Sequence, residues 1–357
     1  MQNRLRIGIV GCGVALHLHS PAILAFGEGA HIVGLCDLDP ARLAQAGDEL
    51  GVSGRFTDLS EMIEKARPDV IHILTPPKTH LPIALEAIEH GCHLLLEKPM
   101  AMTVAESDQI IDAARAKQVK LCLMHNHMLD PQFLQAKSYI ENGGIGDILN
   151  VDGKFFIDRE KMLEEGNDQS DHWIHDLPLG IFSEHATPHM LYLVLDFLAS
   201  VQSVRTVKKT SHLATTSQSF NNLEILLDAG QTSGHISLWD NMAYPNFFIR
   251  VFGTKGVVHL NMYDLTWSVE KHRTTHKTLA AMLATLDMAA QSTVRTGLNT
   301  AKILFGRLKR RPGHRRLIAE FYNSILQGGE PPVTGAEGRE VVRILEMIEQ
   351  DVAARKD

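Results

Sequence analysis

Short apolar runs alternate with helix-patterned segments over the first third of the chain. The runs cover residues 5–10, 31–36, 69–74, 93–96 and 119–124. Strands that are apolar on both faces are typical of a parallel sheet that helices cover on both sides. The alternation therefore predicts βαβ units with right-handed crossovers, and we expect an α/β domain with a doubly wound parallel sheet over residues 1–124.

The pattern changes after Asp130-Pro131. A helix-patterned segment ends in ENGG at positions 141–144, which is a C-cap signal. Longer strand-like runs with polar or glycine turns follow at 148–158, 201–210, 222–227, 232–239, 247–252 and 257–260, and helical patterns return at 315–326 and 335–354. We expect a second, α+β domain with a large, mainly antiparallel open sheet over residues 125–357.

Composition and charge narrow the functional classes. The chain has 357 residues, 44% of them hydrophobic, and a formal net charge of -7 with both signs mixed. This length suits two domains, and this charge does not favour nucleic acid as a partner. The four cysteines show no CxxC spacing, and no apolar run approaches the roughly 20 residues that cross a bilayer. We expect a soluble, reduced, cytoplasmic protein without a transmembrane segment.

A glycine turn joins the first apolar run to the helix after it. GCGVAL occupies positions 11–16, and Asp37 ends the second strand 24 positions after Gly13. We expect a tight turn at Gly11, close approach of a pyrophosphate at Gly13, and a helix N-terminus directed at its charge. Asp37 would accept hydrogen bonds from the adenosine ribose and repel a 2′-phosphate. This favours NAD over NADP in a Rossmann nucleotide-binding domain, with NADP as the alternative.

Leu16 departs from that fingerprint. It takes the third small position, where a large side chain should push the helix away from the strand. A GxG pair is weak evidence by itself, so one alternative is a Rossmann-like domain whose turn binds nothing.

Two polar turns follow neighbouring strands of the predicted parallel sheet. TPPKTH occupies positions 75–80 and EKP positions 97–99. Ligands of an open parallel sheet bind beyond the carboxyl ends of its strands, where both turns lie. Lys98 can orient a substrate hydroxyl there and stabilise negative charge on its oxygen. A lone lysine at a strand end is more often a solvated charge, and in isolation we would favour that interpretation of Lys98.

These motifs together resemble the glucose-fructose oxidoreductase, inositol dehydrogenase and rhizopine catabolism family, Gfo/Idh/MocA. Residues 125–127, 144–148 and 252–256 also resemble family segments, whereas about residues 273–312 have no counterpart. The resemblance implies an N-terminal Rossmann domain and a C-terminal α/β substrate domain whose open sheet often forms oligomer contacts. It also implies an NAD- or NADP-dependent dehydrogenase or reductase of sugars, cyclitols or related polyols, and a homo-oligomer, dimer or tetramer.

The resemblance further implies roles for single residues. Lys98 would be the catalytic lysine, and Asn126 would lie beside the nicotinamide or the substrate. In its second domain the family has an aspartate followed four residues later by a histidine, which is usually the general acid/base. The implied cofactor-binding residues are Gly11, Gly13, Val14, Ala15, Asp37, Thr75, Pro76, His80, Glu97, Lys98 and Asn126.

His189 is the candidate for that histidine. The position four before it holds His185, next to Glu184, instead of aspartate. His189 can take the substrate hydroxyl proton and return it in the reverse reaction. Thr187-Pro188 is typical of the N-cap and first turn of a helix, whose dipole would favour the neutral imidazole. We expect His189 to be catalytic, with a satisfied structural histidine as one alternative.

A metal site is the other alternative for this stretch. His185 and His189 at i and i+4 would share one face of a helix, and Pro188 argues against a continuous helix there. The remaining zinc ligands would come from Glu184, His172, His175 and Asp176. We therefore expect no metal.

The run at 171–180 is polar, aromatic and ends in glycine, as substrate-facing loops often do. The alternative is a surface loop with its tryptophan packed inward. The expected substrate contacts are Trp173, His175, Glu184 and His185.

The segment from 277 to 316 has an amphipathic helical pattern and a basic end. Such a helix can lie on an anionic membrane or bind a phosphorylated substrate. We expect instead that its apolar stripe packs against the body of the protein or another subunit, since such stripes are more often core.

The sequence thus predicts an oxidoreductase that interconverts a secondary alcohol and a ketone on a sugar-like molecule by hydride transfer. Lys98 would stabilise the developing charge and His189 would act as acid/base, with Glu184 or His185 in place of the missing aspartate. Two other hypotheses stay open. One is a dinucleotide-binding sensor or regulator without catalysis, and the other is a metal-dependent enzyme that uses the region of His185 and His189.

Overall fold

The computed structural model describes residues 4–157, 177, 179, 180, 182, 186–210, 220–240, 244–273, 276–308 and 311–355. The chain divides into two compact units, residues 1–126 with 313–346 and residues 127–312 with 347–357. From the sequence, the boundary is expected after residue 124 and residues 313–346 in the second domain. The structure groups residues 313–346 with the first unit instead.

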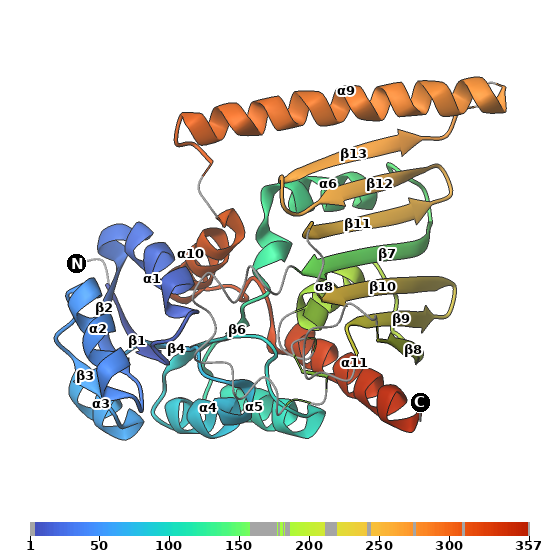
Figure 1. Cartoon of the computed structure of the whole chain (residues 1–357). Helices are drawn as coiled ribbons and strands as arrows, with labels where there is room; N and C mark the ends of the chain where they lie inside the picture. The colour runs from blue at the N-terminus through green and yellow to red at the C-terminus, as the bar shows by residue number, and fades with distance from the viewer. Residues whose placement is uncertain are drawn as a thin grey trace. The chain divides into compact units, whose positions relative to one another are not determined.

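Among its described residues, the first unit contains a six-stranded parallel sheet (Figure 1). Its order is β3-β2-β1-β4-β5-β6, which is the strand order of a Rossmann fold. All of its strand pairs are parallel, as predicted. The strands are β1 (Leu5–Val10), β2 (Ala30–Cys36), β3 (Arg55–Phe56), β4 (Val70–Ile73), β5 (His93–Leu96) and β6 (Leu121–Leu123).

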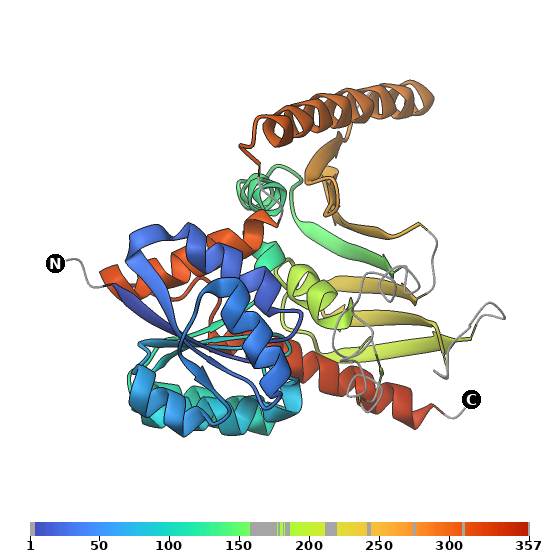
Figure 2. The same ribbon diagram turned by 60° about the vertical axis from the view of Figure 1, so that its left-hand side comes forward.

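Helices cover both faces of this sheet (Figure 2). Local signals set their ends: the Asp39 side chain accepts from the amides of Ala41 and Arg42 at the start of α2, and Gly51 ends that helix in the left-handed conformation. The helices between the strands are α1 (Leu16–Ala25), α2 (Pro40–Leu50), α3 (Leu59–Ala66), α4 (His80–Glu89) and α5 (Val104–Ala116).

The C-terminal part of the chain returns to this first unit. Helix α10 (Pro312–Gln327) buries Phe321 and Tyr322 completely. The Tyr322 ring lies edge-on to Phe26, with 5.2 Å between the ring centroids. After α10 comes α11 (Gly335–Ala354).

The second unit contains, in its described part, a seven-stranded sheet of order β13-β12-β11-β7-β10-β9-β8. Strands β7 and β10 run parallel, and the other neighbours are antiparallel, which confirms the predicted mainly antiparallel sheet. The strands are β7 (Ile148–Ile157), β8 (Ser203–Lys209), β9 (Asn222–Ala229), β10 (Thr232–Asp240), β11 (Asn246–Gly253), β12 (Gly256–Asn261) and β13 (Thr266–Lys271).

One face of this sheet packs against helices α6 (Pro131–Glu141) and α8 (Thr187–Leu195). Gly153 on β7 makes room for α8, because a side chain there would collide with Met190. Since side chains alternate along a strand, Val151 and Phe155 share this face, and both are buried.

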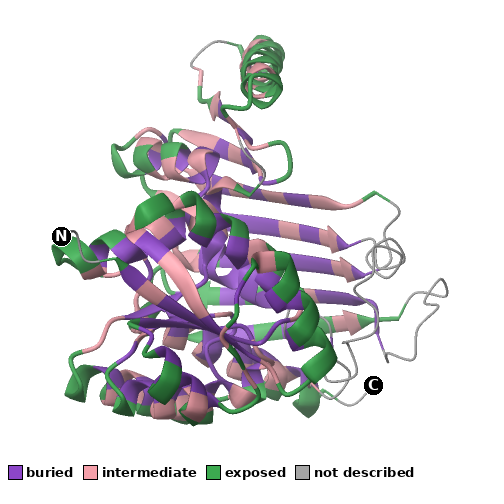
Figure 3. Ribbon diagram, turned by 90° about the vertical axis from the view of Figure 1, so that its left-hand side faces the viewer, coloured by how far each residue is buried: buried purple, intermediate pink, exposed green. Residues whose placement is uncertain are grey.

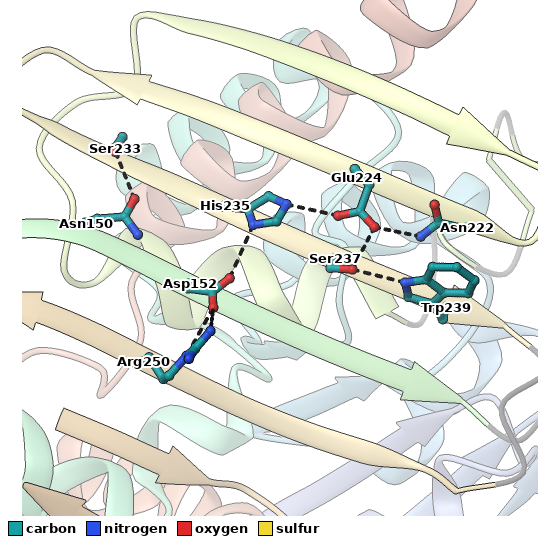
Figure 4. Close-up of polar contacts among 9 residues, drawn as sticks. All are labelled: Asn150, Asp152, Asn222, Glu224, Ser233, His235, Ser237, Trp239 and Arg250. Carbon is teal, nitrogen blue, oxygen red and sulfur yellow. Dashed lines mark hydrogen bonds and ion pairs between the residues drawn. The ribbon is translucent and has the colours of Figure 1, made fainter. Parts of the chain in front are cut away.

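The opposite face carries a polar network across four strands (Figure 4). Asp152 pairs with Arg250 and lies 3.3 Å from the His235 ring nitrogen, and His235 Nε2 lies 2.9 Å from Glu224. Glu224 also accepts hydrogen bonds from Asn222 and Ser237, at 2.9 and 2.8 Å. Neighbours on the same face therefore satisfy both oxygens of Glu224 and one oxygen of Asp152.

Helix α9 (Lys277–Leu304) runs along the edge strand β13 (Figure 1). Gln291 bonds both the amide and the carbonyl of Val269, at 3.0 and 2.9 Å, and Asn299 donates to the carbonyl of Leu265 at 2.8 Å. Arg295 donates to the carbonyl of Trp267 and lies 4.0 Å from its ring centroid. The side chains of α9 thus occupy the free backbone groups of this edge.

The opposite edge strand, β8, is capped in a similar way. Asp351 of α11 accepts hydrogen bonds from the Thr206 amide and hydroxyl, both at 2.7 Å. Both edges of the sheet therefore meet side chains of helices.

The apolar stripe of α9 does not pack on the described part of this chain, so of the two expected packing partners only another subunit stays a prediction. The helix ends at Leu304 and its apolar side chains are largely exposed (Figure 3). The reason is that a strand edge offers N–H and C=O groups, which polar side chains satisfy. The exposed apolar residues of this region are Leu279, Met282, Leu286, Val294, Leu298, Ile303, Leu304 and Phe305. In the part of the chain that the structure describes, no helix has the length and apolar character needed to cross a membrane.

Candidate functional site

The glycine turn of the first unit has the geometry that a dinucleotide needs. Gly11 has φ of +96°, and a Cβ there would lie 2.9 Å from the backbone of Leu74, so only glycine fits. A Cβ at Gly13 would meet nothing within 4 Å, which leaves open space in front of α1. Helix α1 has no capping side chain and no acidic residue in its first turn. Its positive end is thus uncompensated and suits a pyrophosphate.

Asp37 is held against this turn by backbone amides. One carboxylate oxygen accepts from the amide of Cys12 at 2.7 Å and the other from the amide of Asp39 at 2.9 Å. Burial, together with the charge of Asp37, raises the pKa of the Cys12 thiol to about 12, so the thiol is uncharged. A carboxylate has further lone pairs for hydroxyl donors, such as those of a ribose. Val14 is exposed, Ala15 is half-buried, and Leu16 is buried in the core.

His80 joins the turns that follow β4 and β5. Its Nε2 lies 2.8 Å from the carbonyl of Thr75 and its Nδ1 3.2 Å from the carbonyl of Met100. The ring is fully buried, and burial lowers its pKa, against the opposing effect of these carbonyl bonds. The geometry indicates that His80 fixes the two turns relative to each other. Thr75 and Pro76 are half-buried beside it.

Glu97 and Lys98 follow β5 in one buried turn. The Lys98 amide donates to the Glu97 carboxylate at 3.2 Å, and Lys98 is 8% exposed. Burial alone would raise the pKa of Glu97, but its hydrogen bond with His19 and the positive charge of Lys98 lower it. Glu97 is therefore an anion beside Lys98. Its charge favours the ammonium form of that lysine.

Asn126 follows β6 and is buried, as is its neighbour His125. Burial lowers the pKa of His125 to about 3, so this imidazole is neutral. The glycine turn, Asp37, Thr75, the Glu97-Lys98 turn and Asn126 follow β1, β2, β4, β5 and β6, respectively. The carboxyl ends of parallel strands share one edge of the sheet, so the structure collects these predicted residues at that edge.

His189 lies in the first turn of α8 in the second unit. The helix begins at Thr187, with Ala186 rather than Thr187 as N-cap and without a side-chain cap. His189 is buried, and its Nδ1 lies 2.7 Å from the Tyr192 hydroxyl. If Nδ1 donates to the Tyr192 oxygen, Nε2 keeps the lone pair that a general base requires.

Two residues near His189 were missed from the sequence. His127 Nδ1 lies 2.7 Å from the buried Asp130 carboxylate, and the rings of His127 and His189 are 5.1 Å apart between centroids. The amide of His127 donates to the Tyr192 oxygen at 3.4 Å. The i, i+3 spacing of His127 and Asp130 is the available signal in the sequence, where Asp130-Pro131 also marks the start of a helix-patterned segment.

The other predicted substrate contacts, Trp173, His175, Glu184 and His185, lie outside the described residues, as do the remaining ligands of the alternative zinc site. Within the described ranges, no group of three or more His, Cys, Asp or Glu side chains is arranged to hold a metal ion.

The first unit has the features of a dinucleotide-binding domain: a parallel sheet of Rossmann order, a glycine turn at an uncompensated helix N-terminus, and Asp37 held by two amides. The family model Gfo/Idh/MocA, described as an oxidoreductase family with an NAD-binding Rossmann fold, matches residues 5–125. The match places the Rossmann domain of the first unit, residues 5–125, in the Gfo/Idh/MocA family.

Known proteins similar to the chain include Oxidoreductase P35 of Formosa agariphila, which is 23% identical over 76% of this chain and 84% of its own length. Levoglucosan dehydrogenase of Pseudarthrobacter phenanthrenivorans is 33% identical over 44% of this chain and 42% of its own length. The WlbA dehydrogenase of Bordetella pertussis, solved with NADH and UDP-GlcNAcA, superposes with a TM-score of 0.78 at 22% identity. This superposition covers 99% of this chain and 97% of that structure, and it shows the shared fold.

Proposed function

We propose that the chain is an NAD-dependent dehydrogenase that interconverts a secondary alcohol and a ketone on a sugar, cyclitol or related polyol. The observation that carries the proposal is the buried pair of anionic Glu97 and Lys98 at the edge of the sheet that holds the glycine turn. The names of relatives support the substrate class, since they include a levoglucosan dehydrogenase and a structure with UDP-GlcNAcA.

In this proposal NAD, when bound, supplies the nicotinamide carbon that takes up the hydride. Gly11, Gly13 and the N-terminus of α1 hold the pyrophosphate, and Asp37 holds the adenosine ribose. The fixed negative charge of Asp37 disfavours a 2′-phosphate, which supports NAD over NADP.

In the proposed reaction, Lys98 stabilises the charge on the substrate oxygen and His189 transfers the hydroxyl proton. Lys98 donates a hydrogen bond to the reacting hydroxyl and stabilises negative charge on its oxygen. His189, with Nδ1 on Tyr192, takes the hydroxyl proton at Nε2 and returns it in the reverse direction. The assignment of both residues to one reaction rests on the family resemblance. Asp130 with His127 supplies a buried carboxylate near His189, a role that was expected of Glu184 or His185.

The test is turnover of purified variants across a panel of sugars and cyclitols. We expect Lys98→Ala and His189→Ala each to lower kcat by about a hundredfold or more, because each removes an acid/base or charge-stabilising group. NAD should still bind both variants in calorimetry. Lys65→Ala and His90→Ala, at exposed positions, serve as matched controls and should keep wild-type rates. Full turnover in both test variants would refute the proposal, and NAD binding without any turnover by the wild type would favour a sensor.

A further inference from the structure

Four buried side chains of the first unit form a hydrogen-bonded row that the proposed reaction does not use directly. Tyr322 of α10 contacts His72 of β4, with 2.8 Å between the hydroxyl and Nε2. His72 Nδ1 lies 2.9 Å from Nδ1 of His19 on α1. His19 Nε2 lies 3.0 Å from the Glu97 carboxylate. The row therefore ends at the residue next to Lys98.

This row is sealed from solvent. Tyr322, His72 and His19 are each 0% exposed, and the Glu97 side chain is 12% exposed. The Tyr322 ring is fixed by its edge-on contact with Phe26. A buried polar atom that loses its partner costs free energy, so these groups hold one another in place.

The charge of Glu97 determines where the protons of the hydrogen-bonded row lie. Glu97 can only accept, so His19 donates to it from Nε2. Lys98 already places a positive charge beside Glu97, and a second buried cation at His19 would be unfavourable. A neutral His19 accepts at Nδ1 from His72 Nδ1–H, and His72 Nε2 then accepts from the Tyr322 hydroxyl. Each donor in the row thus meets one acceptor.

The shifts of the titratable groups agree with this arrangement. Burial lowers the pKa of His72 well below its usual value and raises the pKa of Tyr322 well above it, so both groups stay uncharged. The other titratable groups that act on Glu97 and its row are His80, Lys98, His125 and His314.

We propose that Tyr322, His72 and His19 are positioning residues that hold the Glu97 carboxylate fixed and ionised, so that Lys98 stays protonated while it stabilises the substrate oxygen. The inference rests on the proposed dehydrogenase reaction. Without the row, Glu97 can rotate or take up a proton, and the ammonium form of Lys98 is then less stable.

The test compares pH profiles of kcat for variants of the row. Tyr322→Phe removes one hydroxyl and keeps the ring, and His19→Ala removes the contact with Glu97. In both variants we expect the alkaline limb of the kcat profile, where Lys98 loses its proton, to move to lower pH by about one unit. KM should change less. His19→Gln keeps an N–H for Glu97 and should restore the wild-type limb. Tyr139→Phe removes a hydroxyl that bonds Gly144 in the other unit and should leave the limb in place.

A lower kcat with an unmoved limb in Tyr322→Phe and His19→Ala would overturn the proposal, because it would indicate damage to packing only. If the wild type turns over no compound of the panel, the proposed dehydrogenase reaction is refuted, but the hydrogen-bonded row can still be tested. Nitrogen-15 NMR of the NAD-bound protein should then show a proton on His19 Nε2 and on His72 Nδ1, with no titration of His72 from about pH 5.5 to 8.5. A His72 ring that titrates in this range would contradict the row itself.

Discussion

At the residue scale, Asp37 shows how a single charge can be fixed beside a turn that we propose binds the cofactor. Two amides, those of Cys12 and Asp39, hold its two oxygens. The carboxylate cannot turn away from a bulky anion without the loss of both bonds. The proposed preference of Asp37 for NAD therefore depends on its charge and its orientation together.

This argument predicts the effect of Asp37→Asn. The amide keeps the shape and one acceptor oxygen but removes the charge, so we expect the Kd for NAD to rise about tenfold and NADP to bind more tightly than to the wild type. Calorimetry with both cofactors measures the change. Asp39→Asn removes the same charge next to the turn and keeps the helix cap, so it should leave the preference unchanged. An unaltered ratio in Asp37→Asn would contradict the role of the charge.

Residues that belong to local motifs could be predicted from the sequence, whereas their long-range partners could not. Gly11, Asp37 and Lys98 stand at strand ends, where the order of elements reveals them. Tyr322 reaches His72 across 250 positions, and no local pattern signals that contact. The partner of His72 depends on where α10 packs, and only the complete fold determines that position.

At the scale of elements, α11 is joined to β8 through one carboxylate. Asp351 accepts from the amide and hydroxyl of Thr206 and from Arg355 at 2.8 Å. Burial tends to raise the pKa of Asp351, but these bonds lower it to about 2. A carboxyl whose pKa is depressed in the folded state stabilises above its unfolded pKa near 4, and this stabilisation is lost as the pH falls towards 2.

We therefore expect Asp351→Asn to lower the free energy of unfolding by about 2 kcal/mol at pH 6 and by much less at pH 2.5. Urea titrations followed by circular dichroism at the two pH values measure the difference. Asp112→Asn breaks only an exposed i, i+3 pair with Arg115 and should change stability little at either pH. An equal loss at both pH values would show that the ionised carboxylate is not responsible.

The sequence predicts the strands that have apolar faces, but it does not predict strands β3 and β13. Strand β3 has only two residues, Arg55–Phe56, and carries no periodicity. Strand β13 reads TWSVEK and pairs with β12 alone, so polar residues interrupt its pattern. Its other neighbour is a helix whose polar side chains bond its backbone, a contact without a sequence signature.

At the scale of the whole molecule, the sequence predicts two kinds of sheet but not the path of the chain between them. Residues 313–346 return to the first unit between the two segments of the second unit, residues 127–312 and 347–357. The helical pattern of this segment fits either unit, because an apolar stripe specifies burial and not its location. Leu317, Ile318, Phe321 and Tyr322 are fully buried, which explains why the segment is stable where it lies.

The two capped edges of the seven-stranded sheet give a prediction about the protein in concentrated solution. Gln291→Ala combined with Asn299→Ala removes two of the three α9 side chains that bond the backbone of β13 and of Leu265 just before it, and leaves Arg295 in place. Because exposed strand edges pair with other chains, we expect faster aggregation, measured by light scattering and thioflavin fluorescence. Thr296→Ala combined with Thr300→Ala, at exposed positions of the same helix, is the matched control. Equal aggregation of both double variants would contradict this role.

Edge capping by α9 and by Asp351 also limits the growth of the sheet. A β-sheet has no intrinsic stop, since every outer strand is a template for another. Here glutamine, asparagine, arginine and aspartate side chains take the positions that the next strand would need. The long, regular strands of the second unit are thereby kept from serving as the seed of a fibril.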